Sequence, residues 1–302
     1  MVYTLTLNPA LDYYLELDAF HLGETNRSKS ETLVAGGKGI NVSMMLNNLG
    51  VSNQALGFLA GFSGEEISRR LQRANINSRF VFLKNGYSRI NVKILSEEES
   101  EINANGAIPT QDEIEMLLHL LEGVSQDDML ILSGSLAQGM PKNFYAQIMK
   151  QCSHTPIILD TIGEALTLAL PYAPLLIKPN KAELEGIFHH KIYSLDEILI
   201  DCKKLQEMGA RNVLVSLGGD GAVFVGENAE VYSLSVPKGE LINSVGAGDS
   251  MVAGFCMGYL RSQDVKEAFY YALASGSASA YSEGFGSLQK VEELFYQMKE
   301  EE

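Results

Sequence analysis

The sequence predicts an α/β fold with a mostly parallel central sheet that is covered by helices on both faces. Three observations predict it. From about residue 110 onward, short apolar segments alternate with helical patterns, as in consecutive βα units. These segments lack the polar alternation of a half-exposed strand, which is typical of buried parallel strands. Polar and glycine-containing loops follow the strand ends, where open parallel sheets bind ligands.

The first third of the chain has a different rhythm. Residues 2–7 predict a strand that ends at Asn8-Pro9, and residues 10–17 predict a second, shorter strand. Residues 87–104 alternate on either side of an acidic tip, which predicts a hairpin. We therefore expect one domain over residues 1–302, with the strands of a small second sheet inserted at about 11–34 and 87–106.

The later segments are assigned by their periodicity and by their caps. Strands are expected at residues 129–132, 156–160, 175–178, 212–216, 222–225 and 230–236. Helices are expected at about 142–152, 163–170, 249–260, 264–281 and 288–299. The capping-box pattern, a serine or threonine followed three residues later by glutamate, predicts helix starts at Ser63, Thr110 and Ser194.

The composition narrows the classes of function. Lys and Arg number 23 against 38 Asp and Glu, for a net charge of −15, so neither nucleic acid nor an anionic membrane is an expected partner. The three cysteines are far apart and lie in apolar surroundings, which favours buried thiols in a reducing cytoplasm. No apolar run is long enough to cross a bilayer, and the first residues do not form a signal peptide.

The most informative stretch is Asn243-Ser-Val-Gly-Ala-Gly-Asp249, because a helical pattern follows it directly. Glycines permit a tight turn, and the unpaired amides at a helix start attract phosphate. A carboxylate would repel phosphate, so Asp249 fits better if it faces a hydroxyl that must lose a proton. Together these features indicate phosphoryl transfer. An ordinary helix start with an acid in its first turn would have the same pattern.

A second glycine turn opens a helix at Ala35-Gly-Gly-Lys-Gly-Ile-Asn41-Val. It matches neither the Walker A pattern nor the dinucleotide fingerprint. Close backbone approach to a small polar ligand, with Lys38 and Asn41 in contact, is one interpretation. A turn with a solvated lysine is the other.

Three polar residues, Arg89, Asn91 and Lys93, fall on one face of the predicted hairpin. A cationic face there could cover a phosphorylated substrate. The solvent face of an antiparallel sheet would look the same.

Taken together, these stretches resemble the PfkB (ribokinase-like) family of carbohydrate kinases, and the resemblance covers nearly the whole chain. Its strongest motifs are Gly36-Gly-Lys-Gly-Ile-Asn41 and Val245-Gly-Ala-Gly-Asp249-Ser, with Lys178-Pro-Asn180-x-x-Glu183 and Ser216-Leu-Gly-Gly between them. The segments Leu7 to Asp12, Arg89 to Lys93 and Ser133 to Leu136 are similar to the branch that contains 1-phosphofructokinase and tagatose-6-phosphate kinase. The segment Arg89-Ile-Asn-Val-Lys93 is more similar to the 1-phosphofructokinases than to the tagatose-6-phosphate kinases.

The resemblance implies a ribokinase-like α/β/α sandwich with a β-sheet lid, and ATP with Mg²⁺ as the donor complex. It implies that Asp249 is the catalytic base and that the amides of Gly246, Ala247 and Gly248 form an anion hole. The implied substrate-binding residues are Asp12, Gly36, Gly37, Lys38, Asn41, Arg89, Asn91 and Ser135. The implied ATP-binding residues are Lys178, Ser216, Leu217, Gly218, Gly219, Asp220, Gly221 and Gly248. Asn180 and Glu183 match the segment that arranges Mg²⁺ through water.

Three positions depart from the branch's pattern. Ala137 replaces a usual proline, Asn105-Gly106-Ala107 replaces a common Gly-Pro, and Ser88 replaces a common threonine. All three lie near the sugar or the lid, so they bear on substrate identity rather than on chemistry. The favoured function is phosphorylation of fructose 1-phosphate. The alternatives are a tagatose-6-phosphate kinase, a kinase for an unphosphorylated sugar or nucleoside, and a non-catalytic nucleotide or sugar-phosphate sensor. An open lid sheet with apolar residues predicts a homodimer that covers the sheet's edges.

Overall fold

The structure, a computed structural model, describes residues 1–300. A nine-stranded sheet forms its centre, with the strand order β13-β12-β11-β10-β9-β8-β1-β4-β5. Its strands, given next in chain order, are β1 (Val2–Thr6), β4 (Asn53–Ala60), β5 (Asn77–Leu83), β8 (Met129–Ser133), β9 (Ile157–Asp160), β10 (Leu176–Ile177), β11 (Val213–Ser216), β12 (Ala222–Val225) and β13 (Val231–Leu234). The strands from β11 to β5 run parallel, whereas β12 is antiparallel to both of its neighbours.

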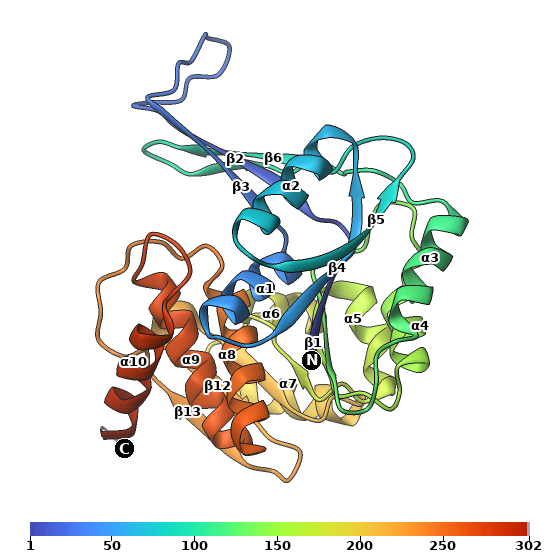
Figure 1. Cartoon of the computed structure of the whole chain (residues 1–302). Coiled ribbons are helices and arrows are strands. Elements are labelled where there is room, and N and C mark those ends of the chain that lie inside the picture. The colour runs from blue at the N-terminus through green and yellow to red at the C-terminus, as the bar shows by residue number, and fades with distance from the viewer. Residues whose placement is uncertain (301–302) are drawn as a thin grey trace.

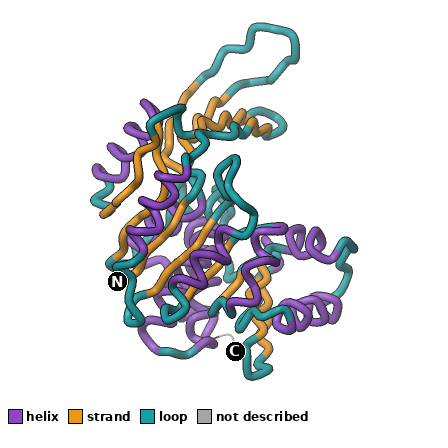
Figure 2. The backbone as a smooth tube through the Cα atoms, turned by 90° about the vertical axis from the view of Figure 1, so that its right-hand side faces the viewer, coloured by secondary structure: helices purple, strands orange, loops and turns teal. Residues whose placement is uncertain are grey.

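Helices cover both faces of this sheet, as the sequence predicts (Figure 1). One face packs against α3 (Gln111–Leu121), α4 (Phe144–Gln151), α5 (Gly163–Ala169), α6 (Lys181–Phe188) and α7 (Leu195–Glu207). The other packs against α1 (Lys38–Asn48), α8 (Ala247–Ser262), α9 (Val265–Ala280) and α10 (Leu288–Glu300). Figure 2 shows the strands between these two layers. The fold is therefore the α/β sandwich that the alternating pattern predicts.

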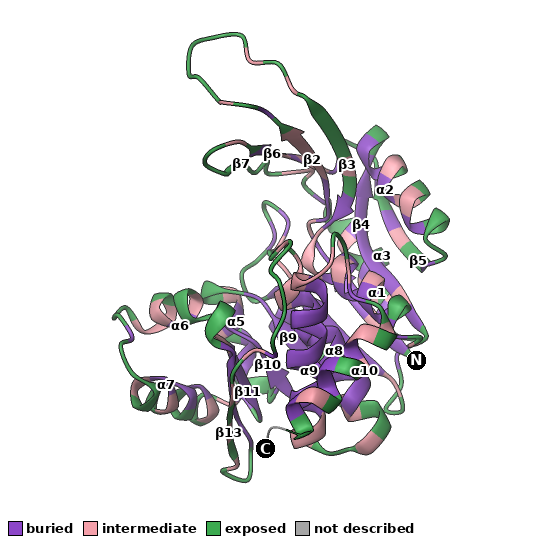
Figure 3. Cartoon of the chain, turned by 90° about the vertical axis from the view of Figure 1, so that its left-hand side faces the viewer, coloured by how far each residue is buried: buried purple, intermediate pink, exposed green. Residues whose placement is uncertain are grey.

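Helix α8 is buried from Asp249 to Gly258, which fixes the turn at its N-terminus against the body (Figure 3). Its small residues permit this burial: a methyl group at Gly254 would lie 2.3 Å from the carbonyl oxygen of Tyr271 on α9. Phe255 and Met257 fill the space against the sheet. The first turn of α8 is consequently held with little freedom to move.

A second, four-stranded sheet has the order β3-β2-β6-β7 and lies beside the main body (Figures 1 and 3). It consists of β2 (Ala10–Glu16), β3 (Ser30–Gly36), β6 (Arg89–Leu95) and β7 (Ser100–Ile102), and we call it the lid sheet. Helix α2 (Gly61–Arg73) packs beneath it, through the cluster that contains Leu11, Leu59 and Ile67. The segment 17–29 between β2 and β3 extends away from the body in Figures 1 and 2.

The capping predictions were confirmed at Thr110 and Ser194, and the one at Ser63 was wrong. Helix α2 begins at Gly61, and its N-cap, Ala60, has no capping side chain. The Ser63 hydroxyl donates instead to the carbonyl oxygen of Ser88 at 2.7 Å. A tertiary contact to the start of the lid hairpin therefore replaces the local cap.

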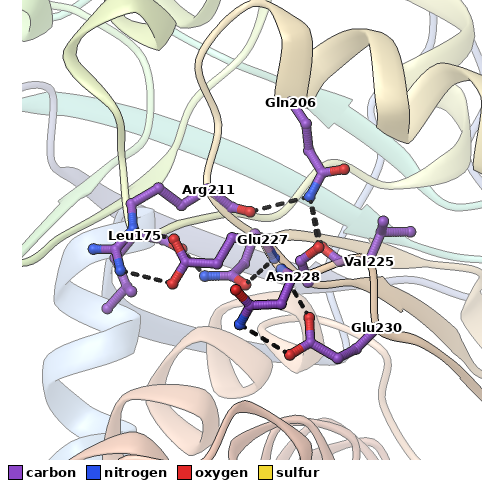
Figure 4. A network of polar contacts seen from close by, with 9 residues as sticks. Leu175, Gln206, Arg211, Val225, Glu227, Asn228 and Glu230 are labelled. Atoms are coloured by element: carbon purple, nitrogen blue, oxygen red, sulfur yellow. Dashed lines mark hydrogen bonds and ion pairs between the residues drawn. The ribbon is translucent and has the colours of Figure 1, made fainter.

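A polar network joins the hairpin of β12 and β13 to the end of α7, at the opposite end of the molecule from the lid sheet (Figures 1 and 4). The Gln206 amide donates to the carbonyls of Arg211 and Gly226, at 3.1 and 2.9 Å. Arg211 also forms a two-bonded ion pair with Glu227, at 2.7 and 2.8 Å.

Among residues 1–300, no helix is both long enough and apolar enough to cross a membrane.

Candidate active site

The turn before α8 has the geometry of an anion-binding site. Gly246 is its N-cap, with φ 77°, a left-handed conformation that favours glycine. The Ala247 amide donates to the Ser244 carbonyl at 3.2 Å, whereas the amides of Gly246 and Gly248 have no such partner within residues 1–300. The sequence predicted that all three amides bind the anion. Two of them are open for it, and the third would first have to leave Ser244.

Asp249 follows in the first turn of α8 and is 7% exposed. The Asn41 side chain donates to its carboxylate at 2.7 Å, so the two glycine turns meet at this pair. Burial, and next the charge of Asp160, raise the pKa of Asp249 to about 6, against the opposing effects of Asn41 and two lysines. A carboxylate with this pKa is ionised at neutral pH and is a stronger base than an exposed aspartate.

The turn before α1 places Lys38 and Asn41 one helical turn apart. A methyl group at Gly36 would lie 2.2 Å from a carboxylate oxygen of Asp12, so a side chain there would displace Asp12. Lys38 Nζ lies 3.1 Å from Asp160 Oδ1 and 3.5 Å from Glu183 Oε1. Although burial opposes its charge, the carboxylates around it, led by Asp160, raise the pKa of Lys38 above its ordinary value. Lys38 is therefore a fixed cation.

A cavity of about 390 Å³ opens beside Lys38. Lys38 and Arg89 supply its cations, and the polar groups of Asn103, Ser135 and Thr161 complete much of its wall. The Arg89 guanidinium donates to the Asn8 carbonyl at 3.1 Å, which fixes the direction of the side chain. Two cations and several hydrogen-bonding groups make this cavity, which we call the cation pocket, suitable for a phosphate.

Two other members of the predicted cationic face do not reach the cation pocket. Lys93 is 8% exposed and pairs with Glu101 on β7. Asn91 donates to Asp12 Oδ1 at 2.8 Å and accepts from the Ala104 amide at 3.3 Å. The sequence predicted that Asn91 binds substrate. Its amide holds Asp12 in place, and its contact with substrate stays a prediction.

Asp12 and Asn41 line a second cavity, of about 460 Å³, between the lid sheet and the turn before α8. Asn243, Val245 and Phe285 line its other side. Burial raises the pKa of Asp12 above its ordinary value, against the opposing hydrogen bond from Asn91. Helix α1 contributes to both cavities, Lys38 to the cation pocket and Asn41 to the second cavity, and Asn41 also holds Asp249.

Apart from Gly248, in the first turn of α8, the predicted nucleotide residues lie at the ends of β10 and β11. Gly218–Asp220 forms a single 3₁₀ turn, exposed to solvent, directly after β11. Lys178 is buried, and its Nζ lies 3.2 Å from where a Gly248 methyl group would be. Lys178 therefore lies under the anion-binding turn, while the Ser216 amide, donating to the Pro179 carbonyl at 3.1 Å, joins the two strand ends.

Asn180 and Glu183, the predicted Mg²⁺ residues, form a reciprocal cap at the start of α6. The Glu183 amide donates to the Asn180 side chain at 2.7 Å, and the Asn180 amide donates to Glu183 Oε2 at 2.9 Å. Glu183 Oε1 faces Lys38 and the cation pocket. Within residues 1–300 no three His, Cys, Asp or Glu residues cluster as metal ligands. Glu183 Oε1, 3.5 Å from Lys38 Nζ, fits Mg²⁺ bound through water, because this ion keeps several of its waters and binds substrate phosphates.

Sequence reasoning missed Asp160, whose carboxylate contacts Lys38 and influences Asp249. The only available signal was an acidic residue at the end of an apolar strand. It also missed Asn8, Asn103 and Thr161, which line or support the cation pocket. These residues have no motif of their own, because only the sheet register brings their strand ends together.

Comparisons with known proteins identify the family. A family model described as pfkB family carbohydrate kinase matches residues 5–291. The 1-phosphofructokinase of Bacillus subtilis is 41% identical over 301 residues, covering 99% of each chain. The D-tagatose-1-phosphate kinase of Bacillus licheniformis is 35% identical over 302 residues, again covering 99% of each.

A solved structure has the same fold along its whole length. It is the phosphofructokinase-2 of Escherichia coli in complex with fructose-6-phosphate, with a TM-score of 0.91, 27% identity and 99% of each chain covered. The family match spans nearly the whole chain and includes both glycine turns and Asp249. The chain therefore belongs to the pfkB family of carbohydrate kinases, ATP-dependent enzymes whose fold and sugar-phosphate chemistry the sequence motifs predicted.

Proposed function

We propose that this protein is a 1-phosphofructokinase, which transfers the γ-phosphoryl group of ATP to the 6-hydroxyl of fructose 1-phosphate. The single observation that carries the proposal is the buried Asp249, held by Asn41 beside the open amides of the anion-binding turn. The similarity to the Bacillus subtilis 1-phosphofructokinase supports the choice of acceptor.

In the proposed mechanism, Asp249 accepts the proton of the attacking hydroxyl as the new P–O bond forms and the bond to ADP breaks. The amides of Gly246 and Gly248 stabilise the charge on the transferred group, and that of Ala247 joins them if it leaves Ser244. Asp249 is suited to this role because its raised pKa, about 6, still leaves it ionised at neutral pH.

The cation pocket is the proposed site of the phosphate that the acceptor already carries. Arg89 and Lys38 bind it, and Ser135 adds a hydroxyl from the turn after β8. Asp12 and Asn41 bind the sugar hydroxyls, and Gly36 and Gly37 allow the backbone to approach the sugar closely. Asn91 contributes indirectly, because its amide donates a hydrogen bond that orients Asp12.

The nucleotide is proposed to bind along the ends of β10 and β11. Lys178 lies where it can contact the phosphates, and the segment Ser216 to Gly221, with Leu217, Gly218, Gly219 and Asp220, lies toward the rest of the nucleotide. Asn180 and Glu183 would hold Mg²⁺ through water. When bound, the ion neutralises phosphate charge during transfer. Because ATP is the donor, we also propose a cytoplasmic location.

We propose that the lid sheet closes over the acceptor, excludes water and pairs with a second copy. Apolar side chains remain exposed on the lid sheet and on the segment 17–29, with Ile102 61%, Phe20 39% and Leu95 37% exposed. Sedimentation should therefore show a dimer at micromolar concentration. Ile102→Lys should shift it toward monomer, whereas Ile200→Lys on α7, which removes a 56% exposed isoleucine away from the lid, should not. A wild-type protein that sediments only as a monomer would refute the pairing.

The acceptor is tested by measuring ADP release with Mg-ATP and each of four sugars: fructose 1-phosphate, tagatose 6-phosphate, fructose 6-phosphate and free fructose. The proposal predicts the highest kcat/KM for fructose 1-phosphate. Preference for tagatose 6-phosphate would favour the second candidate, a tagatose-6-phosphate kinase. ATP binding without turnover of any acceptor would favour a non-catalytic sensor.

A further inference from the structure

One buried carboxylate at the site, that of Asp160, has no role in the mechanism above. Asp160 ends β9, and its side chain is 1% exposed. Its Oδ1 lies 3.1 Å from Lys38 Nζ and 3.9 Å from Lys178 Nζ. Lys38 faces the cation pocket and Lys178 lies under the anion-binding turn, so a single carboxylate contacts the two lysines on either side of the reacting groups.

The second oxygen, Oδ2, has no hydrogen-bond partner within residues 1–300. The same holds for the buried hydroxyls of Ser133 and Thr6. These three residues end the adjacent strands β9, β8 and β1, and Ser133 pairs with Asp160 in the sheet register. An ionised carboxylate in such a place is costly unless cations compensate it. Lys38 and Lys178 supply that compensation, and the carboxylate of Asp160 in turn holds both ammonium groups.

We propose that Asp160 is a positioning residue for phosphoryl transfer, which holds Lys38 and Lys178 in place beside the reacting groups. This inference rests on the proposed function. Asp160 itself contacts neither the acceptor hydroxyl nor the transferred group in this mechanism. It acts through the lysines that it touches and through its charge.

The charge of Asp160 also influences the pKa of Asp249, as the groups around Asp249 indicate. Burial and the charge of Asp160 raise its pKa, whereas Asn41, Lys38 and Lys178 lower it. Removing the charge of Asp160 leaves both lysines with less compensation and takes away one raising influence. Both changes lower the pKa of Asp249 from about 6 and make it a weaker base.

The test is the variant Asp160→Asn, which keeps the side-chain shape and removes the charge. With Mg-ATP and fructose 1-phosphate, kcat should fall roughly ten- to hundredfold, the scale of a small misplacement of catalytic groups. The acid limb of the kcat profile, expected near pH 6 for the wild type, should move to lower pH. Asp160→Glu restores the charge, so its limb should return to the wild-type position with part of kcat recovered.

Asp201 on α7 offers a matched control. Its side chain is also 1% exposed and also contacts two basic groups, His190 Nε2 and Lys204 Nζ, each at 2.8 Å. It lines neither cavity of the site. Asp201→Asn should lower the unfolding temperature and leave the acid limb of the kcat profile unchanged. A purely structural role for Asp160 would make the two variants behave alike.

The outcomes separate this inference from the proposed function. A wild-type protein that does not phosphorylate fructose 1-phosphate would refute the proposed function. An active wild type with the same acid limb in Asp160→Asn would overturn the positioning role alone. If Asp160→Asn does not fold, Asp160→Glu decides: kcat below the wild type with an unmoved acid limb supports the role, and wild-type kcat overturns it.

Discussion

Replacing Asp249 with asparagine should destroy activity and stabilise the fold. The side chain is 7% exposed and receives a hydrogen bond from Asn41 at 2.7 Å. Asparagine keeps the shape and can still accept that hydrogen bond, but it cannot accept a proton. A positioned general base contributes roughly 10²- to 10⁴-fold, so kcat should fall by that factor, about 3 to 5 kcal/mol in the activation barrier.

The expected gain in stability follows from the raised pKa. The carboxyl has a pKa of about 6 in the folded protein against 3.8 as its reference value. Between these values the folded state binds more protons than the unfolded state, so the free energy of unfolding falls as pH rises through this window. A shift of this size corresponds to about 3 kcal/mol, most of which Asp249→Asn should recover above pH 6.

Two assays on the same samples check this prediction. Steady-state ADP release measures kcat, and thermal unfolding at pH 4 and at pH 7.5 measures stability. We expect the variant to show this loss of kcat and to unfold at a higher temperature than the wild type, with the difference larger at pH 7.5. A kcat within tenfold of the wild type would refute the role as base. A lower unfolding temperature at pH 7.5 would refute the electrostatic argument.

Two further variants test the cation pocket and the turn. Arg89→Ala should raise KM for fructose 1-phosphate at least tenfold and leave KM for ATP unchanged, because it removes a pocket cation; Arg79→Ala, on the exposed side of β5, should change neither, and equal effects would refute the pocket assignment. Gly246→Ala forces an alanine to φ 77° and places a methyl group 2.8 Å from Phe285, so it should cost about 1–2 kcal/mol of stability and lower kcat. Gly123→Ala, with open space around the new methyl group, is its control, and a fully active Gly246→Ala would contradict the geometry.

The sequence predicted those parts of the structure that local patterns determine. The parallel sheet follows from apolar strands between helices, and the two glycine turns follow from residues that only particular backbones require. Thr110 and Ser194 cap their helices as predicted, because each cap is made within four residues. Whether the lid sheet and the body form one functional domain stays a prediction.

Contacts between distant segments could not be predicted in the same way. The Asn41–Asp249 pair joins residues 208 positions apart, and the Lys38–Asp160 pair joins residues 122 positions apart. Lys93 has the alternation of a substrate-facing residue, yet the lid register places it opposite Glu101. Ser63 matches the capping pattern, but its hydroxyl donates a hydrogen bond to the Ser88 carbonyl on another segment. In each case tertiary pairing decided the role of the side chain.

The central claim is that this site transfers a phosphoryl group from ATP to the free 6-hydroxyl of fructose 1-phosphate. The most direct measurement is the ³¹P NMR spectrum of the protein incubated with Mg-ATP and fructose 1-phosphate. We predict a second phosphomonoester signal, that of fructose 1,6-bisphosphate, growing in a one-to-one ratio with ADP. Inorganic phosphate in place of that signal, or no ADP at all, would contradict the account.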